Sequence, residues 1–217
     1  MTDEFGIEPR GRRRVLWWVA AVGILVAVVV VSLVRDGDPD DALLTAEDFG
    51  GGYDVAAMTA AEFAQSGATD LPEDIEPPEC AELLRSRPEP ANPELAAGVS
   101  ARGARTAYLE VVLPADDVSE WDTDRLDEVV GTCGTTTFDD GDTTGTVEFS
   151  HLDVPVEDGF ALAARVSGSD GVVTLGVAVS RIGEHVVVLT GVAQGDLDER
   201  EFSRLVRAAG ERVSAHL

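Results

Sequence analysis

The residue types with the clearest chemical meaning in this chain of 217 residues are its two cysteines, Cys80 and Cys133. An even number of cysteines in a protein outside the cytoplasm favours a disulfide. The loop that this bond closes spans about 53 residues, which the chain-entropy model converts to about 4 kcal/mol of stability. The alternative is a pair of free or metal-binding thiols, but two cysteines without a nearby histidine do not complete a tetrahedral zinc site. We therefore predict a structural disulfide between Cys80 and Cys133.

The three histidines do not form a catalytic pattern. His151 and His185 fall on expected strands far apart in the sequence, and His216 lies next to the C-terminus. Nucleophilic catalysis needs a histidine beside a serine or cysteine, together with an orienting carboxylate. The sequence has no nucleophile elbow, phosphate loop, HExxH motif or dinucleotide fingerprint. We expect no enzyme activity, no catalytic residue and no cofactor.

Two acidic stretches have spacings that can be compared with metal sites. The positions that match a calcium loop are Asp36, Asp38, Asp40, Leu43 and Glu47. The loop position that should be glycine is Asp41, however, and Pro39 lies inside the stretch. We favour an acidic stop after a membrane span here. At residues 139–142 we favour a connection between strands, with weak divalent-ion affinity as the alternative, and we predict no metal site.

The charge of the chain restricts its partners. The formal net charge is −25, and residues 36–217 carry 38 carboxylates against 11 arginines. A domain this negative is repelled by phosphate, which excludes nucleic acid as a partner. It is repelled by anionic lipid headgroups in the same way.

An uncharged segment of twenty residues, 15–34, determines where the domain lies. At ~1.5 Å per residue, a helix of this length spans the ~30 Å hydrocarbon core of a bilayer. Four arginines precede the segment, and an arginine and an acidic stretch follow it. Because basic residues stay on the cytoplasmic side, we expect the N-terminus inside the cell membrane and the bulk of the chain outside. The expected parts are a cytoplasmic tail (1–14), a single-pass transmembrane signal anchor (15–34), an acidic linker (35–42) and an extracytoplasmic domain (43–217).

The alternative to an anchor is a cleaved signal peptide. Apolar regions of signal peptides usually have about 7–15 residues and end at a small-x-small cleavage site. Here the apolar run is longer and ends at residues 29–34 (VVVSLV), which form a poor cleavage site. The tail 1–14 is too short for a folded domain, so we expect any signal to reach the cytoplasm through a partner.

Hydrophobic periodicity predicts the elements of the outer domain. We expect helices at about 43–49, 60–65, 80–86, 122–133 and 196–217, and strands at about 53–58, 105–113, 143–150, 160–166, 173–179 and 186–192. The proline-containing stretches 66–78 and 88–93 are interpreted as loops. Residues 182–184 form a tight turn in an antiparallel hairpin. Strands with helices before and after them indicate an α+β domain, a mostly antiparallel sheet with packed helices.

Two of these helices have well-defined apolar faces. In the helix that ends at Cys133, this cysteine falls on the same face as Leu126, Val129 and Val130, so the disulfide should be buried. The apolar face of the last helix consists of Phe202, Leu205, Val206, Ala209 and Val213.

Several segments carry a resemblance to a known family. They are LLTAEDF followed by GGGY at 43–53, PPEC at 77–80, the helix that ends in Cys133 with a threonine-rich strand after it, EHVVVLTGVAQGD at 184–196, and the last helix. Together they resemble the PknH-like extracellular sensor domains of actinobacteria over residues 43–217. The resemblance implies an α+β domain with a cleft for a ligand of unknown identity. Members linked to kinases have two disulfides, whereas this chain can form one and has no kinase.

These observations lead to ranked expectations. We expect a membrane-anchored, sensor-like protein without enzyme activity that binds a small ligand or an envelope protein. The alternative is an envelope carrier or scaffold that holds an apolar small molecule or lipid, and a hydrolase comes third. A carrier should have a large apolar cavity, and a sensor a packed core with a polar cleft or flat patch. An enzyme should place a group of strongly perturbed pKa in a pocket beside a positioned partner.

Overall fold

The computed structural model describes residues 39–58, 74–85, 97–115, 123–139, 144–169 and 171–217. The expected tail, the expected anchor and the helix predicted at 60–65 lie outside the described residues, as does the stretch 88–93. No helix within the described ranges is long and apolar enough to cross a membrane.

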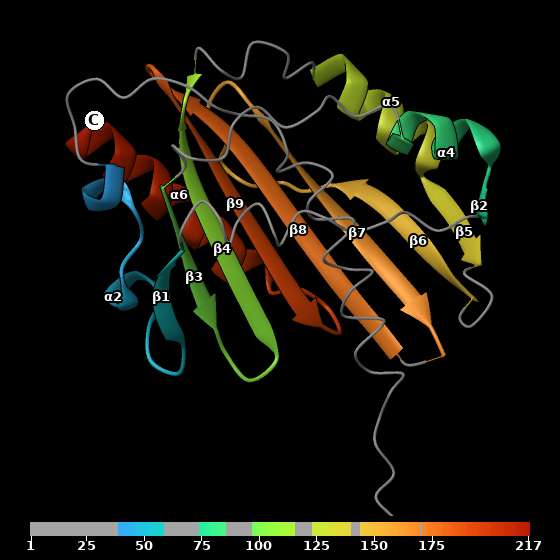
Figure 1. The fold of residues 1–217 in the computed structure, drawn as a ribbon, viewed down its shortest axis with the longest axis horizontal. Coiled ribbons are helices and arrows are strands. Elements are labelled where there is room, and N and C mark those ends of the chain that lie inside the picture. Colours follow the sequence, from blue (N-terminus) through green and yellow to red (C-terminus); the bar gives the residue numbers. More distant parts are fainter. Residues whose placement is uncertain (1–38, 59–73, 86–96, 116–122, 140–143, 170) are drawn as a thin grey trace, which may run out of the picture.

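The described residues form one antiparallel sheet with helices packed on it, in agreement with the predicted α+β class (Figure 1). The strand order is β1-β3-β4-β9-β8-β7-β6-β5-β2. The strands are β1 (Asp54–Met58), β2 (Asp74–Glu76), β3 (Ala97–Arg102), β4 (Thr106–Pro114), β5 (Thr135–Asp139), β6 (Thr144–His151), β7 (Phe160–Gly168), β8 (Gly171–Ile182) and β9 (His185–Gln194). The helices are η1 (Pro39–Ala42), α2 (Ala46–Phe49), α4 (Pro78–Arg85), α5 (Thr123–Cys133) and α6 (Glu199–His216).

The helices divide between the two ends of the sheet. Helix α6 packs on β8 and β9 and contacts η1 and α2, near the end formed by β1, β3 and β4 (Figure 1). Helices α4 and α5 pack on each other, α4 against β2 and α5 against β6, at the opposite end (Figure 1). We call these the α6 end and the disulfide end.

The central strands are buried on both faces, which explains their nearly continuous apolar sequences. In β9, Val186 and Val188 belong to the hydrophobic core on one face, and Val187 and Leu189 to the core on the other. The β8–β9 hairpin turns at Gly183, whose φ of 60° is accessible to glycine at little steric cost. This confirms the predicted hairpin.

Helix α6 confirms its predicted apolar face, because all five predicted residues are buried. It begins at Glu199, three residues later than the sequence predicts. Asp198 is the N-cap, and its carboxylate accepts hydrogen bonds from the backbone N–H groups of Arg200 and Glu201. This cap satisfies helix donors that otherwise have no partner, and it therefore fixes the start of the helix.

Two short segments differ from the sequence-based expectation, and a third segment, 97–102, has no sequence-based prediction. Residues 74–76, predicted as loop, form β2, because Ile75 is buried while its two acidic neighbours face solvent. Residues 97–102 form β3 although their sequence, AGVSAR, has little of the β-branched content that marks a strand. Residues 39–42, expected in the linker, form η1, and Ala42 is fully buried against the domain.

Candidate functional site

An open cleft of about 990 Å³ lies at the disulfide end of the sheet. It is lined by Asp74, Ile75, Glu76, Pro78, Ala81, Glu82, Thr137, Phe138, Asp139, Thr144, Gly145, Thr146, Gly168 and Ser169. Consecutive residues of a strand point to opposite faces of a sheet, yet three consecutive residues of β2, of β5 and of β6 line this cleft. The cleft therefore borders the ends of the strands and the edge of the sheet.

The lining residues are mostly hydrogen-bond acceptors. Four carboxylates (Asp74, Glu76, Glu82 and Asp139) and four hydroxyl groups (Thr137, Thr144, Thr146 and Ser169) contribute to the cleft. Ionised carboxylates only accept hydrogen bonds, whereas hydroxyls accept and donate. The described lining includes no basic side chain. A molecule that carries positive charge or several donors is the chemical complement of this surface.

The register of the edge strand concentrates negative charge at the cleft. Asp74 of β2 lies directly opposite Asp139 of β5, and Glu76 lies opposite Thr137. Like charges directly opposite each other destabilise an antiparallel pair. Ile75 compensates by burying its side chain in the core. The buried side chain of Ile75 therefore keeps the edge strand β2 on the sheet, with Asp74 and Glu76 on either side of it.

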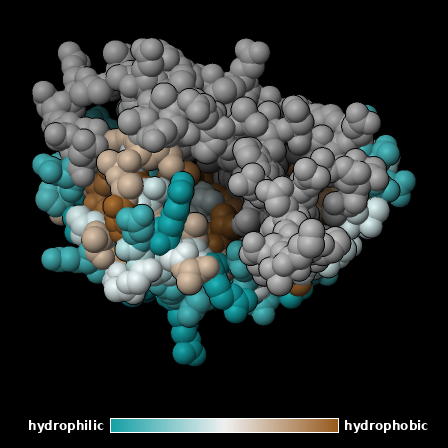
Figure 2. Space-filling model, turned by 60° about the horizontal axis from the view of Figure 1, so that its bottom comes forward, coloured by the Kyte–Doolittle hydropathy of each residue, from teal (hydrophilic) through white to brown (hydrophobic). Residues whose placement is uncertain are grey.

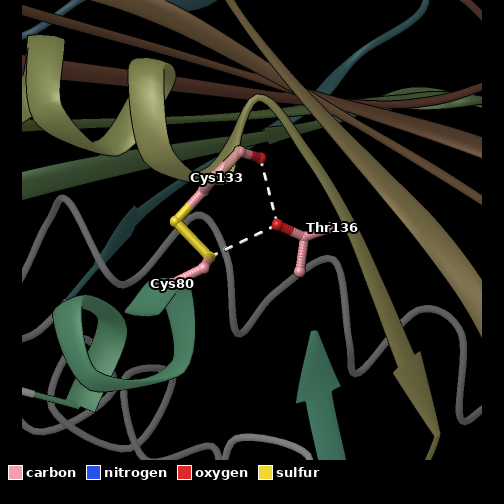
Figure 3. Close-up of a disulfide and its surroundings, with 3 residues drawn as sticks. All are labelled: Cys80, Cys133 and Thr136. Atoms are coloured by element: carbon pink, nitrogen blue, oxygen red, sulfur yellow. Dashed lines mark hydrogen bonds between the residues drawn. A yellow bond between two sulfur atoms is a disulfide. The ribbon is translucent and has the colours of Figure 1, made fainter. Parts of the chain in front are cut away.

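The predicted disulfide lies next to the cleft and links α4 to α5. Cys80 of α4 and Cys133 of α5 are bonded, with Cα atoms 5.1 Å apart, and both residues are fully buried, as predicted. The hydroxyl of Thr136 on β5 donates to the carbonyl oxygen of Cys133 at 3.0 Å and lies 3.3 Å from the sulfur of Cys80 (Figure 3). The disulfide and this hydroxyl therefore join α4, α5 and β5 next to the cleft.

The face of the molecule shown in Figure 2 combines hydrophilic and hydrophobic residues. In Figure 2, hydrophilic side chains project along the lower margin, and hydrophobic residues lie set back in a hollow behind them. Among the described residues, the large hydrophobic side chain classed as exposed is that of Leu217, at 38%.

A second polar cluster lies at the α6 end, beneath η1 and α2. The side chain of Glu110 on β4 is fully buried, and its Oε2 accepts a hydrogen bond from the backbone N–H of Leu44 at 2.6 Å. Its Oε1 and the hydroxyl of the neighbouring Tyr108 are buried without a hydrogen-bond partner. Burial raises the pKa of Glu110 to about 7, although the hydrogen bond from Leu44 and the charge of Arg212 act in the opposite direction.

One ion pair and two hydrogen bonds from α6 hold the segment 39–49 near Glu110. Arg212 contacts the carboxylate of Asp48 at 2.8 Å and the hydroxyl of Thr45 at 3.1 Å. Arg204 donates to the carbonyl oxygen of Asp48 at 2.6 Å. Burial raises the pKa of Asp48, but hydrogen bonds from Thr45 and the charge and hydrogen bond of Arg212 outweigh burial, so the pKa lies below its usual value. Asp48 is therefore charged under ordinary conditions.

Aromatic rings close the same cluster. The ring centroids of Phe49, Tyr53 and Tyr108 lie 5.7 to 6.1 Å apart. Tyr53 donates its hydroxyl hydrogen bond to Glu201 at 3.2 Å. Burial and the nearby charge of Glu201 raise the pKa of Tyr53, so this hydroxyl remains a donor at neutral pH.

The structure does not bring the three histidines together. His151 ends β6 and His185 begins β9, and β7 and β8 lie between these two strands. His216 ends α6. The Nε2 of His151 lies 3.6 Å from the carboxylate of Asp127, and both side chains are largely exposed. This contact is a surface ion pair at most, which contributes little to stability.

The described residues include no group of three or more His, Cys, Asp or Glu side chains that could hold a metal ion. Of the residues that match a calcium loop, Asp36 and Asp38 lie outside the described residues. Glu47 is exposed on α2, and Leu43 is buried against the domain. Residues 140–142 of the acidic turn are likewise outside the described ranges, and Asp139 ends β5 as a strand connection requires.

Glu110 is the residue that sequence reasoning missed. It lies in RTAYLEVVL, a segment correctly predicted as a strand. The available signal was one charge inside a run of apolar residues, because a strand buried on both faces has no solvent-facing position for it.

No family model matches this chain, and no curated protein matches its sequence. Solved structures that are similar to it in fold include the following two. One is of an uncharacterized protein from Mycobacterium smegmatis, an Rv0999 ortholog, with a TM-score of 0.49 and 17% identity over 82% of this chain and 98% of that chain. The other is the extracellular domain of PknH from Mycobacterium tuberculosis, with a TM-score of 0.47 and 11% identity over 82% of this chain and 100% of that chain. PknH gives its name to the family that the sequence resembles.

Proposed function

We propose that this chain is a membrane-anchored, sensor-like protein without enzyme activity that binds a polar, positively charged ligand or partner segment outside the cytoplasm. The observation that carries the proposal is the cleft of about 990 Å³ with four carboxylates and four hydroxyl groups in its lining. Residues 15–34 supply the anchor in this proposal. The arginines before that segment support an orientation with the domain on the outer side of the membrane.

The packing beside α6 supports a sensor over the apolar carrier. Phe202, Leu205 and Ala209 of α6 are fully buried against the sheet. On the other face, Leu175 and Val177 of β8 are also fully buried. Such packing leaves little room for a lipid between the sheet and the described helices, since protein interiors are close-packed.

The position of Glu110 supports a role without catalysis. A general acid or base must lie within hydrogen-bond reach of a substrate. The carboxyl group of Glu110 has a strongly raised pKa, but it is fully buried beneath Leu44 and belongs to the α6 end of the sheet. The cleft lies at the opposite end. The perturbed group and the open pocket are thus separate features.

A cationic probe tests the cleft. We expect spermidine, titrated calorimetrically into the full chain in detergent at about 150 mM salt, to bind with an affinity that falls about tenfold in the double variant Asp74→Asn/Glu76→Gln. A loss of this size corresponds to about 1.4 kcal/mol. Both residues are exposed on β2, so the fold should tolerate the change.

The matched control is Glu184→Gln/Glu211→Gln, which removes the same charge from exposed positions away from the cleft. This variant should bind spermidine nearly as the unaltered chain does. An equal loss in both variants would show general attraction to an acidic protein and would contradict a site in the cleft. Mass spectrometry of the purified full chain provides the second test, because a stoichiometric bound lipid would favour the carrier.

A further inference from the structure

The inference starts from the groups that surround Glu110. Its cross-strand partners are Val99 on β3 and Leu189 on β9, which are both buried and apolar. On its own strand, Tyr108 and Val112 share its face of the sheet. None of these neighbours offers a charge that could balance a carboxylate.

The charged groups that face Glu110 come from the helices above it. Arg212 of α6 attracts a carboxylate at this position, and Asp48 of α2 repels it. Arg204 of α6 is directed to the backbone of Asp48. Asp41 of η1 is exposed at the surface. Because Arg212 and Asp48 are paired with each other at 2.8 Å, the net field that they exert on Glu110 is small.

The hydrogen bonds of Glu110 do not suit its charged form. Buried carboxylates that stay ionised typically accept about two or three backbone N–H bonds. Glu110 accepts one, from Leu44, and its Oε1 has no partner. That single donor belongs to the segment 39–49, whose residues Ala42, Leu43 and Leu44 are buried in the same hydrophobic cluster as the neighbours of Glu110. If this segment left the sheet, Glu110 would lose its hydrogen bond and part of the cover that separates it from solvent.

We propose that Glu110 is a proton-binding site that controls whether residues 39–49 are docked on the sheet. The segment docks when the carboxyl group carries its proton, and it is released when the proton leaves. Residues 39–49 follow the expected anchor at 15–34 after a few residues, so release changes how the domain is held at the membrane. That last consequence rests on the proposed function, whereas the proton-linked docking does not.

The sign of the effect follows from the two environments of the carboxyl group. The pKa of Glu110 is about 7 in the docked state and 4.5 for an ordinary glutamate. The docked state therefore binds the proton more tightly, and docking is strongest at low pH. Between these two values, the equilibrium constant for release rises about tenfold per pH unit, and it levels off at higher pH. The carboxylate of Asp48 keeps its charge over this range, because its pKa lies below the usual value.

Hydrogen exchange on the full chain measures the release directly. After correction for intrinsic rates, we expect protection of the amides in residues 42–49 to fall about tenfold per pH unit between pH 5.5 and 7. Amides in the centre of β8 should keep their protection. The variant Glu110→Gln should remove the pH dependence from residues 42–49, because glutamine does not titrate. The control Glu47→Gln, at an exposed position of α2, should retain it.

A titration of the unaltered chain keeps the proposal testable if Glu110→Gln fails to fold. The carboxyl carbon of Glu110, followed by NMR with labelled glutamate, should titrate with a midpoint about two units above that of exposed glutamates. Protection of residues 42–49 that does not change with pH would overturn the proposal. A midpoint for Glu110 in the ordinary range would overturn it as well.

Discussion

The two ends of the sheet hold their helices by different chemistry. At the disulfide end, a covalent bond between Cys80 and Cys133 joins α4 to α5, and the hydroxyl of Thr136 joins both to β5. At the α6 end, the segment 39–49 is held by polar contacts of Arg204 and Arg212, by one hydrogen bond to Glu110 and by its buried apolar side chains. A covalent bond does not respond to pH, whereas a buried carboxyl group does. The disulfide end is suited to keep the shape of the cleft, whereas the α6 end is suited to change its docking state with pH.

Removing the disulfide should have the largest effect. We expect Cys80→Ala/Cys133→Ala to lower the free energy of unfolding by about 4 kcal/mol, because the unfolded chain regains the entropy of an open loop. Urea denaturation of the full chain measures the change. The control Thr136→Val keeps the disulfide, removes one hydroxyl, and should cost about 1 kcal/mol. A double variant as stable as the unaltered chain would contradict a structural role for the bond.

The next largest effect should be the pH dependence that Glu110 causes. Its pKa is raised to about 7 in the folded protein, so its contribution to stability is fully present below about 4.5 and is lost as the pH rises through about 7. The loss amounts to about 3 kcal/mol at most. Calorimetry between pH 5 and 8 on the unaltered chain and on Glu110→Gln should give a difference with this sign. Stability that rises with pH only in the unaltered chain would contradict the buried, proton-binding carboxyl.

Some of this arrangement could be predicted from the sequence, because the patterns that reveal it lie within single helices and hairpins. The face of α6 repeats every three or four residues, and β8 and β9 are long apolar runs with a glycine turn between them. Cys133 falls on the apolar face of its own helix, so burial of the disulfide could also be predicted.

The candidate sites could not be predicted, because they depend on contacts between distant residues. Leu44 and Glu110 are 66 positions apart, and no local pattern relates a backbone N–H to a carboxylate at that distance. The cleft depends on the pairing of β2 with β5, which places Asp74 opposite Asp139. Since β2 has three residues, periodicity could not reveal it.

Loss of Arg212 should have a smaller effect, confined to the α6 end. The side chains of Arg212 and Asp48 are 28% and 21% exposed, so we expect Arg212→Ala to destabilise the protein by about 1 to 2 kcal/mol. Because the charge of Arg212 lowers the pKa of Glu110, its removal should move the titration of Glu110 to higher pH. NMR titration and urea denaturation report the two effects. Arg207→Ala, at an exposed position of α6, is the control and should leave both nearly unchanged.

The smallest expected effect is a gain in stability at the disulfide end. Asp74→Asn removes one of two like charges that lie directly opposite each other, so it should stabilise the fold by about 0.5 kcal/mol. The gain should shrink at high salt, because screening already weakens the repulsion. Thermal unfolding at low and high salt measures it. A loss of stability at both salt concentrations would show that Asp74 makes a favourable contact that the register does not reveal.

Hydrogen exchange of the full chain at pH 5.5 and 8.5, with and without a reductant, compares the two ends in one measurement. High pH should expose the amides of residues 42–49 and leave those of α4 and of residues 129–133 protected, while the reductant should do the reverse. If either treatment alone opened both ends to the same extent, the two ends would form one cooperative unit, and the separation between a covalent end and a proton-sensitive end would be wrong.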